Sequence, residues 1–149
     1  MASFSKVAMD TAIDRLARMH IANYRAATRR YPRRVLGLGS ATSPAVAMRM
    51  GLKGCLVLAS DLMRPAARPF ADTSQLNVHY AAPYVAGDPA LESWFDLVVC
   101  DWMPEQVPAC EAAAVLAECH RVLRPGGVCS IHDGVHWFVL QKPAAPALH

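Results

Sequence analysis

The sequence predicts one α/β domain: a Rossmann-like, doubly wound, three-layer αβα sandwich around a mostly parallel sheet. Short apolar runs that suit buried strands alternate along the chain with segments of helical periodicity. The run FDLVVCD is continuously apolar between its acids, as expected for a strand covered by helices on both faces. A length of 149 residues, of which 54% are hydrophobic and 18% charged, suits a single core.

The first expected element is an amphipathic helix from about Ser5 to Arg30, within an N-terminal segment of residues 1–32 that closes with Pro32. Its buried face is marked by residues that recur three or four positions apart, namely Met9, Ile13, Leu16, His20 and Tyr24.

Residues 33–140 are expected to form the α/β domain, with six short strands. Each strand is an apolar run, and the runs are RVLGL (34–38), CLVLASD (55–61), LNVHY (76–80), FDLVVCD (95–101), VCSIHD (128–133) and VHWFVL (135–140). Residues 141–149 follow as a tail without a folding pattern of its own. Right-handed crossovers bring the carboxyl ends of parallel strands to one edge of the sheet, where ligands bind in such folds.

Two helices are expected between these strands. The first covers residues 43–51, with Ser43 as its N-cap, Pro44 at the first helical position and Gly51 as its stop. The second ends at an RPGG turn, and its buried face comprises Ala112, Val115, Leu116, Cys119, Val122 and Leu123. Two prolines within residues 63–74 predict a loop there.

The cysteines indicate buried thiols and no metal site. They number five, include no CxxC pair and lie partly inside apolar runs, at positions 55, 100, 110, 119 and 129.

Positive charge is concentrated at the start of the chain. Residues 1–34 hold eight basic and two acidic side chains, whereas the rest holds seven basic and ten acidic ones. Four arginines recur at helical spacing, namely Arg15, Arg18, Arg25 and Arg29. They form either a solvated helix face or a surface for RNA, an acidic partner or an anionic membrane.

No apolar run is long enough to form a transmembrane helix, and the start lacks the apolar segment of a secretory signal. We therefore expect a cytoplasmic protein. A mitochondrial presequence is the alternative, because the first segment is rich in arginine, but Asp10 and Asp14 argue against it.

The order of motifs resembles the class I S-adenosylmethionine-dependent methyltransferases, from about Arg33 to Asp133. FDLVVCD followed by ECHRVLRPGGVCSI is similar to the fourth strand, covering helix and Gly-Gly turn of that family. RRVLGLGSATS falls where its first motif should be, and Asp61 in LVLASDLM falls where its ribose-binding acid should be.

The resemblance implies S-adenosylmethionine as cofactor and methyl transfer to an unidentified acceptor, small or macromolecular. The cofactor site that it implies comprises Gly37, Gly39, Ser40, Ala41, Asp61, Leu62, Tyr80 and Asp101. Without a Cβ, Gly39 lets the backbone approach a ligand. Asp61 follows it by 22 residues, close to the spacing at which an acid takes a ribose hydroxyl in dinucleotide sites, although it also suits a helix N-cap. Tyr80 or Tyr84 either stacks on adenine or packs in the core.

The glycine loop departs from the family's pattern. Gly37 stands in place of the usual acid, and Ala41 and Ser43 stand in place of the second and third glycines. These changes predict a weakened or modified cofactor site, with each lost contact lowering affinity about tenfold.

Candidate catalytic and acceptor-binding residues follow the fourth and fifth strands. Asp101 is expected to orient or deprotonate the nucleophile, with Trp102 and Met103 beside it. The segment IHDGVH offers His132 and His136 as candidate bases, because imidazole titrates near neutral pH. Asp133 lies between them as a further substrate contact. For each of these residues the alternative is a structural role as a cap or a packed ring.

Two other readings of the sequence remain open. A non-catalytic domain of the same fold would act through its basic N-terminal helix as a binding or assembly module. An NAD-binding Rossmann domain is disfavoured, because GLGSATS fits the GxGxxG pattern only with Ser43 out of place. The short C-terminal region predicts an open sheet edge, and hence a homodimer or larger assembly.

Overall fold

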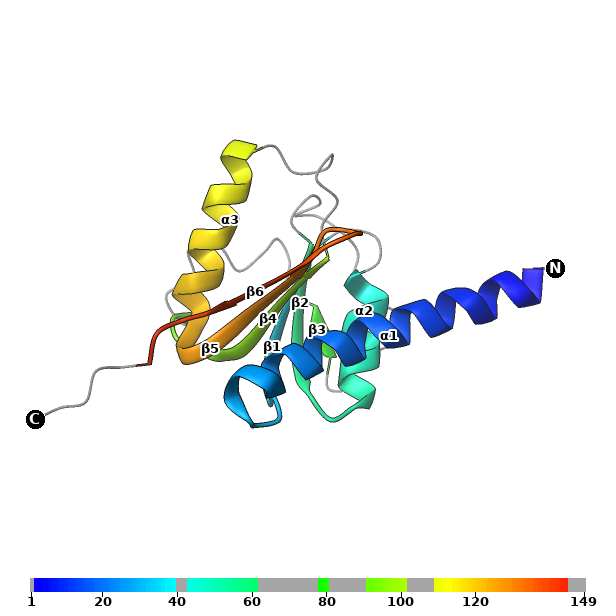
Figure 1. Ribbon diagram of the computed structural model, residues 1–149, viewed down its shortest axis with the longest axis horizontal. Coiled ribbons are helices and arrows are strands. Elements are labelled where there is room, and N and C mark those ends of the chain that lie inside the picture. The colour runs from blue at the N-terminus through cyan, green and yellow to red at the C-terminus, as the bar shows by residue number, and fades with distance from the viewer. Residues whose placement is uncertain (1, 40–42, 62–77, 81–90, 102–108, 145–149) are drawn as a thin grey trace, which may run out of the picture.

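The computed structural model describes residues 2–39, 43–61, 78–80, 91–101 and 109–144, and within them a six-stranded sheet in the order β3-β2-β1-β4-β5-β6 (Figure 1). The strands are β1 (Arg34–Gly39), β2 (Leu56–Asp61), β3 (Val78–Tyr80), β4 (Phe95–Asp101), β5 (Leu123–His132) and β6 (Trp137–Gln141). The helices are α1 (Ala2–Thr28), α2 (Ser43–Leu52) and α3 (Ala109–Val122). Strands β1 to β5 pair in parallel, and β6 runs antiparallel to β5.

Helices cover both faces of the sheet. Helices α1 and α2 lie on one face and α3 on the other (Figure 1). Side chains alternate accordingly along β1, where Val35 belongs to the core under α1 and α2 while Leu36 and Leu38 belong to the core under α3. The structure therefore confirms the predicted doubly wound α/β fold and its three layers.

Helix α1 crosses the sheet antiparallel to β5. The predicted buried face is confirmed where side chains are described: His20 and Tyr24 are buried, and Ile13 and Leu16 pack against the core. The helix ends at Thr28 rather than Arg30, because Arg29 adopts a positive φ of 61°.

A buried polar contact attaches α1 to β5. The Oγ of Ser130 accepts a hydrogen bond from Nδ2 of Asn23 at 3.0 Å and lies 2.8 Å from Nδ1 of His20. Both His20 and Ser130 are fully buried, so this contact pairs polar groups that water does not reach. This contact therefore sets the position of α1 along β5.

The passage from α3 into β5 differs from the sequence prediction. Leu123 was expected on the helix and RPGG in a turn before the strand, but β5 begins at Leu123, which pairs with Phe95. The register then shifts, because Leu97 pairs with Val128, and the extra residues of β5 are accommodated by Gly126 at a φ of 83°.

The second glycine of this turn is required by close packing. A Cβ on Gly127 would lie 2.9 Å from the carbonyl oxygen of Arg124 and 3.0 Å from that of Asp96. Both are backbone oxygens, which cannot move aside as a flexible side chain can, so a larger residue would displace β4 or the start of β5.

Strand β6 closes the described sheet. It starts at Trp137 rather than Val135, because the preceding residues form a turn, and it includes Gln141. Pairing continues one residue further, where Lys142 N donates to Gly127 O at 2.8 Å. The tail that was expected from residue 141 therefore begins as part of the sheet.

Four cysteines, at positions 55, 100, 119 and 129, are buried free thiols, as predicted. Burial raises the pKa of the Cys55 thiol to about 11. The pKa of Cys129 is also raised, mainly by its hydrogen bond with Cys119 and then by burial. Both thiols therefore stay protonated at neutral pH, which makes them poor nucleophiles.

The predicted loop over residues 63–74 lies outside the described residues, as do residues 76 and 77 of the third expected strand. None of the helices has, within the described residues, a stretch apolar enough and long enough to span a membrane.

Candidate active site

The carboxyl edge of the sheet brings four predicted site residues into one row. Gly39, the last residue of β1, is level with Asp61 of β2 on one side and Asp101 of β4 on the other. Asp101 is in turn level with His132 of β5. Neighbouring strands lie about 4.8 Å apart, so three spacings place the ends of this row about 14 Å from each other.

The other predicted cofactor residues lie around this row or outside the described residues. Gly37 is buried two positions before the end of β1, and Tyr80 ends β3 level with Ala59 rather than with Asp61. The cofactor candidates Ser40, Ala41 and Leu62 lie outside the described residues, as do the acceptor-binding candidates Trp102 and Met103.

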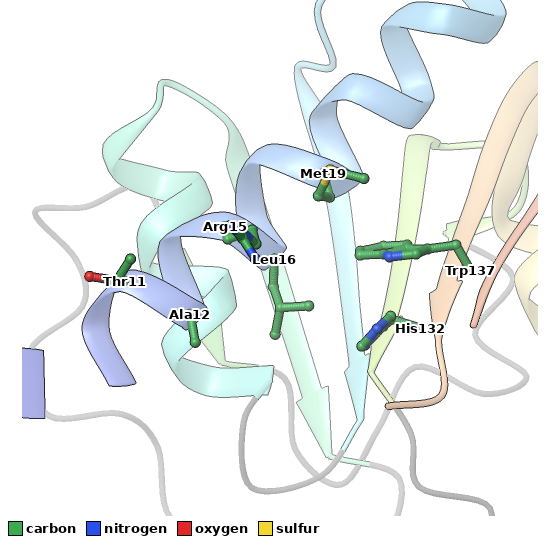
Figure 2. Close-up of a pocket in the computed structure, with 7 residues that line it drawn as sticks. All are labelled: Thr11, Ala12, Arg15, Leu16, Met19, His132 and Trp137. Carbon is green, nitrogen blue, oxygen red and sulfur yellow. The ribbon is translucent and has the colours of Figure 1, made fainter. Parts of the chain in front are cut away.

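A cavity of about 880 Å³ opens beside His132, at one end of the row (Figure 2). It lies between α1 and the start of β6, and its lining residues are Thr11, Ala12, Arg15, Leu16, Met19, His132 and Trp137. In Figure 2 the Leu16 side chain extends from the helix toward His132 and Trp137. Most of this lining is apolar, while Arg15 and His132 supply a cation and an imidazole.

The Trp137 ring contacts the rings of two histidines. Its centroid lies 4.4 Å from that of His132, with the rings tilted by 41°. The ring of the buried His20 meets the Trp137 ring edge-on, with the two centroids 4.9 Å apart. Because His20 also contacts Ser130, the cavity wall is continuous with the buried polar contact that positions α1.

The structure separates the two candidate bases. His132 lines the cavity, whereas the side chain of His136 is 70% exposed and lies 3.5 Å from the carboxylate of Asp133. The same carboxylate accepts hydrogen bonds from the backbone N–H of Val135 and His136, at 2.8 and 2.6 Å.

These two backbone N–H groups, the His136 bond first, hold the pKa of Asp133 below its ordinary value of 3.8. Asp133 therefore stabilises the turn between β5 and β6. Before this turn His132 lines the cavity, and after it His136 is exposed to solvent.

The arginines on α1 have different surroundings. Arg15 lines the cavity, while Arg18 lies 2.7 Å from the carboxylate of Asp14, which also contacts Lys53 at 2.9 Å. The Lys53 contact lowers the pKa of Asp14 more than any other. Arg25 is exposed on the last turn of the helix.

Sequence reasoning missed the apolar walls of the cavity. Its helical wall is formed by residues that share one face of α1, namely Thr11, Ala12, Arg15, Leu16 and Met19. Their spacing marks one helix face, but only the fold shows that this face meets Trp137.

Comparisons with known proteins agree with the fold. A family model described as a methyltransferase domain matches residues 35–131. Phosphoethanolamine N-methyltransferase 1 from Haemonchus contortus, solved with phosphoethanolamine and S-adenosylhomocysteine, has a TM-score of 0.50 at 16% identity. That similarity covers 88% of this chain and 32% of the nematode protein, so the chain spans about a third of its length.

A second solved structure is described as a putative S-adenosyl-L-methionine-dependent methyltransferase from Methanococcus maripaludis. It has a TM-score of 0.46 at 14% identity, and the similarity covers 82% of this chain and 61% of the archaeal one. No curated protein sequence matches the chain.

Proposed function

The chain belongs to the methyltransferase domain family, and we propose that it transfers a methyl group from S-adenosylmethionine to a small acceptor bound between α1 and the β5–β6 turn. The observation that carries this proposal is the row of Gly39, Asp61, Asp101 and His132, which ends at the cavity. Ligands of parallel α/β sheets bind at this edge.

The residues in the row fit the cofactor. Gly39 carries no side chain where the backbone must approach the ligand, and the Asp61 carboxylate suits the two ribose hydroxyls as an acceptor of hydrogen bonds. Gly37 offers no acid for the ammonium group of the cofactor, so we expect binding in the micromolar range rather than tighter. When bound, the cofactor supplies an already activated methyl group.

The cavity favours a small acceptor with an apolar or aromatic body. A volume of about 880 Å³ is in the range of small-molecule sites, and Leu16, Met19 and Trp137 give it apolar walls. Arg15 suits an acidic group on such an acceptor.

His132 is the base that we propose for an acceptor whose nucleophile carries a proton. It is the imidazole that lines the cavity, and its neighbour Trp137 restricts how the ring can turn. Positioning and exclusion of water by the apolar walls would supply the rest of the catalysis.

Calorimetric titration of S-adenosylmethionine and S-adenosylhomocysteine tests the cofactor site. We expect micromolar binding of both to the intact protein and at least about tenfold weaker binding to Asp61→Ala, because a charged acceptor of two hydrogen bonds is lost. Asp14→Ala removes an acid on the surface of α1 instead and should leave both affinities unchanged. Failure of either compound to bind at millimolar concentration would refute the proposal.

The alternative of a non-catalytic module acting through the basic helix has less support. Arg15 lines the cavity and Arg18 forms an ion pair with Asp14. Two of the four arginines therefore make contacts within the domain, which leaves fewer positive charges for an external partner.

We also propose that the outer edge of β6 pairs with a second copy of the chain. β6 is the last strand of the sheet, and Phe138, Val139 and Leu140 are all about half exposed. An exposed apolar edge strand favours pairing with another strand, and a two-fold axis would let β6 pair with itself. Sedimentation at micromolar concentration should show a dimer that Leu140→Lys converts to a monomer; a monomeric intact protein would contradict this.

A further inference from the structure

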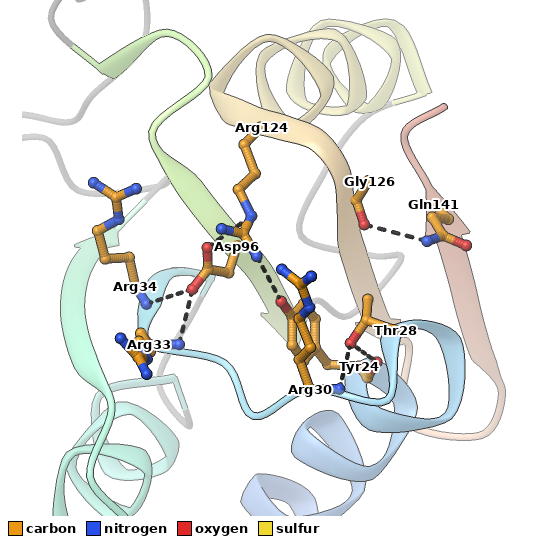
Figure 3. A network of polar contacts seen from close by, with 9 residues as sticks. All are labelled: Tyr24, Thr28, Arg30, Arg33, Arg34, Asp96, Arg124, Gly126 and Gln141. Atoms are coloured by element: carbon orange, nitrogen blue, oxygen red, sulfur yellow. Dashed lines mark hydrogen bonds and ion pairs between the residues drawn. The ribbon is translucent and has the colours of Figure 1, made fainter. Parts of the chain in front are cut away.

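A second cleft lies at the amino edge of the sheet, opposite the edge that carries His132. It has a volume of about 510 Å³ and is lined by Arg30, Tyr31, Arg33, Asp96 and Arg124. Three arginines and one aspartate line it, which leaves a surplus of two positive charges. Figure 3 shows the polar contacts around it.

Asp96 organises the cleft and is occupied by internal contacts. Its side chain is almost completely buried, and Oδ2 accepts hydrogen bonds from the backbone N–H groups of Arg33 and Arg34, at 2.9 and 3.0 Å. Oδ1 forms an ion pair with Arg124, whose Nε lies 2.9 Å away. Among the described residues, no donor is aligned to give Oδ1 a hydrogen bond. The negative charge is therefore balanced inside the protein.

Arg124 is held in place before any ligand binds. Besides its ion pair with Asp96, its Nη2 donates to the hydroxyl of the buried Tyr24 at 3.1 Å (Figure 3). Its side chain is still about a third exposed, so the fixed guanidinium lines the cleft. A preorganised donor loses little freedom when it binds an anion.

Arg30 and Arg33 add two charges on anchored backbone. The N–H of Arg30 donates to Oγ1 of Thr28 at 3.1 Å, and that of Arg33 to Asp96. Within the ranges that the structure describes, neither guanidinium forms an ion pair. Their charge is thus available to a ligand.

We propose that this cleft binds the phosphate group of a small molecule. Guanidinium groups recognise phosphate oxygens through short, charge-assisted hydrogen bonds, often two at a time. The volume suits a phosphate group with a compact body attached.

A nucleic-acid strand is disfavoured because the ring of Trp94 is already covered and the hydroxyl of Tyr31 is already hydrogen-bonded. The guanidinium of Arg34 lies 4.5 Å above the ring of Trp94, which also meets Phe95 edge-on at 5.0 Å. The hydroxyl of Tyr31 donates to Lys53 O at 2.6 Å. Binding of single strands usually relies on open rings on which bases stack.

Titration of inorganic phosphate and of glycerol 3-phosphate into the full chain, at constant ionic strength, tests the proposal. We expect both to bind, and Arg30→Gln and Arg33→Gln each to weaken binding about tenfold or more. Both side chains are exposed, so the variants should melt at the temperature of the intact protein. Tighter binding of the ester would identify a phosphomonoester as the ligand, and tighter binding of phosphate the free anion.

The control variant is Arg25→Gln, which removes an exposed arginine of α1 that does not line the cleft. It should bind both probes as the intact protein does. Absence of binding, or equal loss in Arg25→Gln and Arg33→Gln, would overturn the proposal. A single-stranded RNA oligonucleotide that binds more tightly than either probe and is lost with Arg33→Gln would overturn it in favour of a nucleic-acid surface.

Discussion

Replacing His132 with glutamine should lower kcat by about 10²- to 10⁴-fold with any acceptor that must lose a proton, because general-base catalysis contributes that much. Glutamine keeps a polar group of similar size beside Trp137 but does not take up a proton at neutral pH. The measurement is steady-state kinetics once the acceptor is known, with KM and kcat determined separately. A fall in kcat at nearly constant KM would identify a contribution to the chemical step.

His136→Gln is the matched control, because it changes a histidine of the same turn that is 70% exposed. Its kcat should stay close to that of the intact protein. If both variants were unimpaired, proton transfer would have to be assigned elsewhere, with Asp101 as the next candidate.

Asp96→Ala should lower the free energy of unfolding by about 3 kcal/mol, since removing this buried carboxylate leaves the groups that contact it without their partner. Two backbone N–H groups, from Arg33 and Arg34, would lose their acceptor, and Arg124 would lose its counter-ion. Urea denaturation followed by circular dichroism measures the change.

Glu118→Ala provides the comparison, because Glu118 pairs with Arg121 at 2.9 Å on the partly exposed surface of α3. A surface pair of this kind contributes about 0.5 kcal/mol. If the two variants lowered the free energy of unfolding by similar amounts, Asp96 would not stabilise the amino edge of the sheet as proposed.

Much of the fold could be predicted because local pattern and tertiary packing agree. FDLVVCD is apolar where β4 is covered on both faces, and the spacing of His20 and Tyr24 matches the buried face of α1. The row at the carboxyl edge could be predicted because parallel strands that end on Asp61 and Asp101 must align.

Other features depend on contacts between distant residues, which periodicity does not show. Trp137 was expected only as a strand residue, because nothing in VHWFVL indicates that α1 lies above it. Asp96 follows the first residue of an apolar run and carries no local signal of its contact with Arg124. The start of β5 at Leu123 depends on pairing with β4, which overrides the helical spacing that precedes it.

The contact between His20 and Ser130 joins positions 110 residues apart, and this separation affects how the domain forms during translation. Helix α1 is synthesised before β5, and the 110 residues between the two contacts take about 5 to 20 s to translate at ordinary elongation rates. During that interval the apolar face of α1 lacks its strand partner. The domain therefore completes its core only after β5 has been synthesised, and until then the nascent helix is a natural target for chaperones that bind apolar segments.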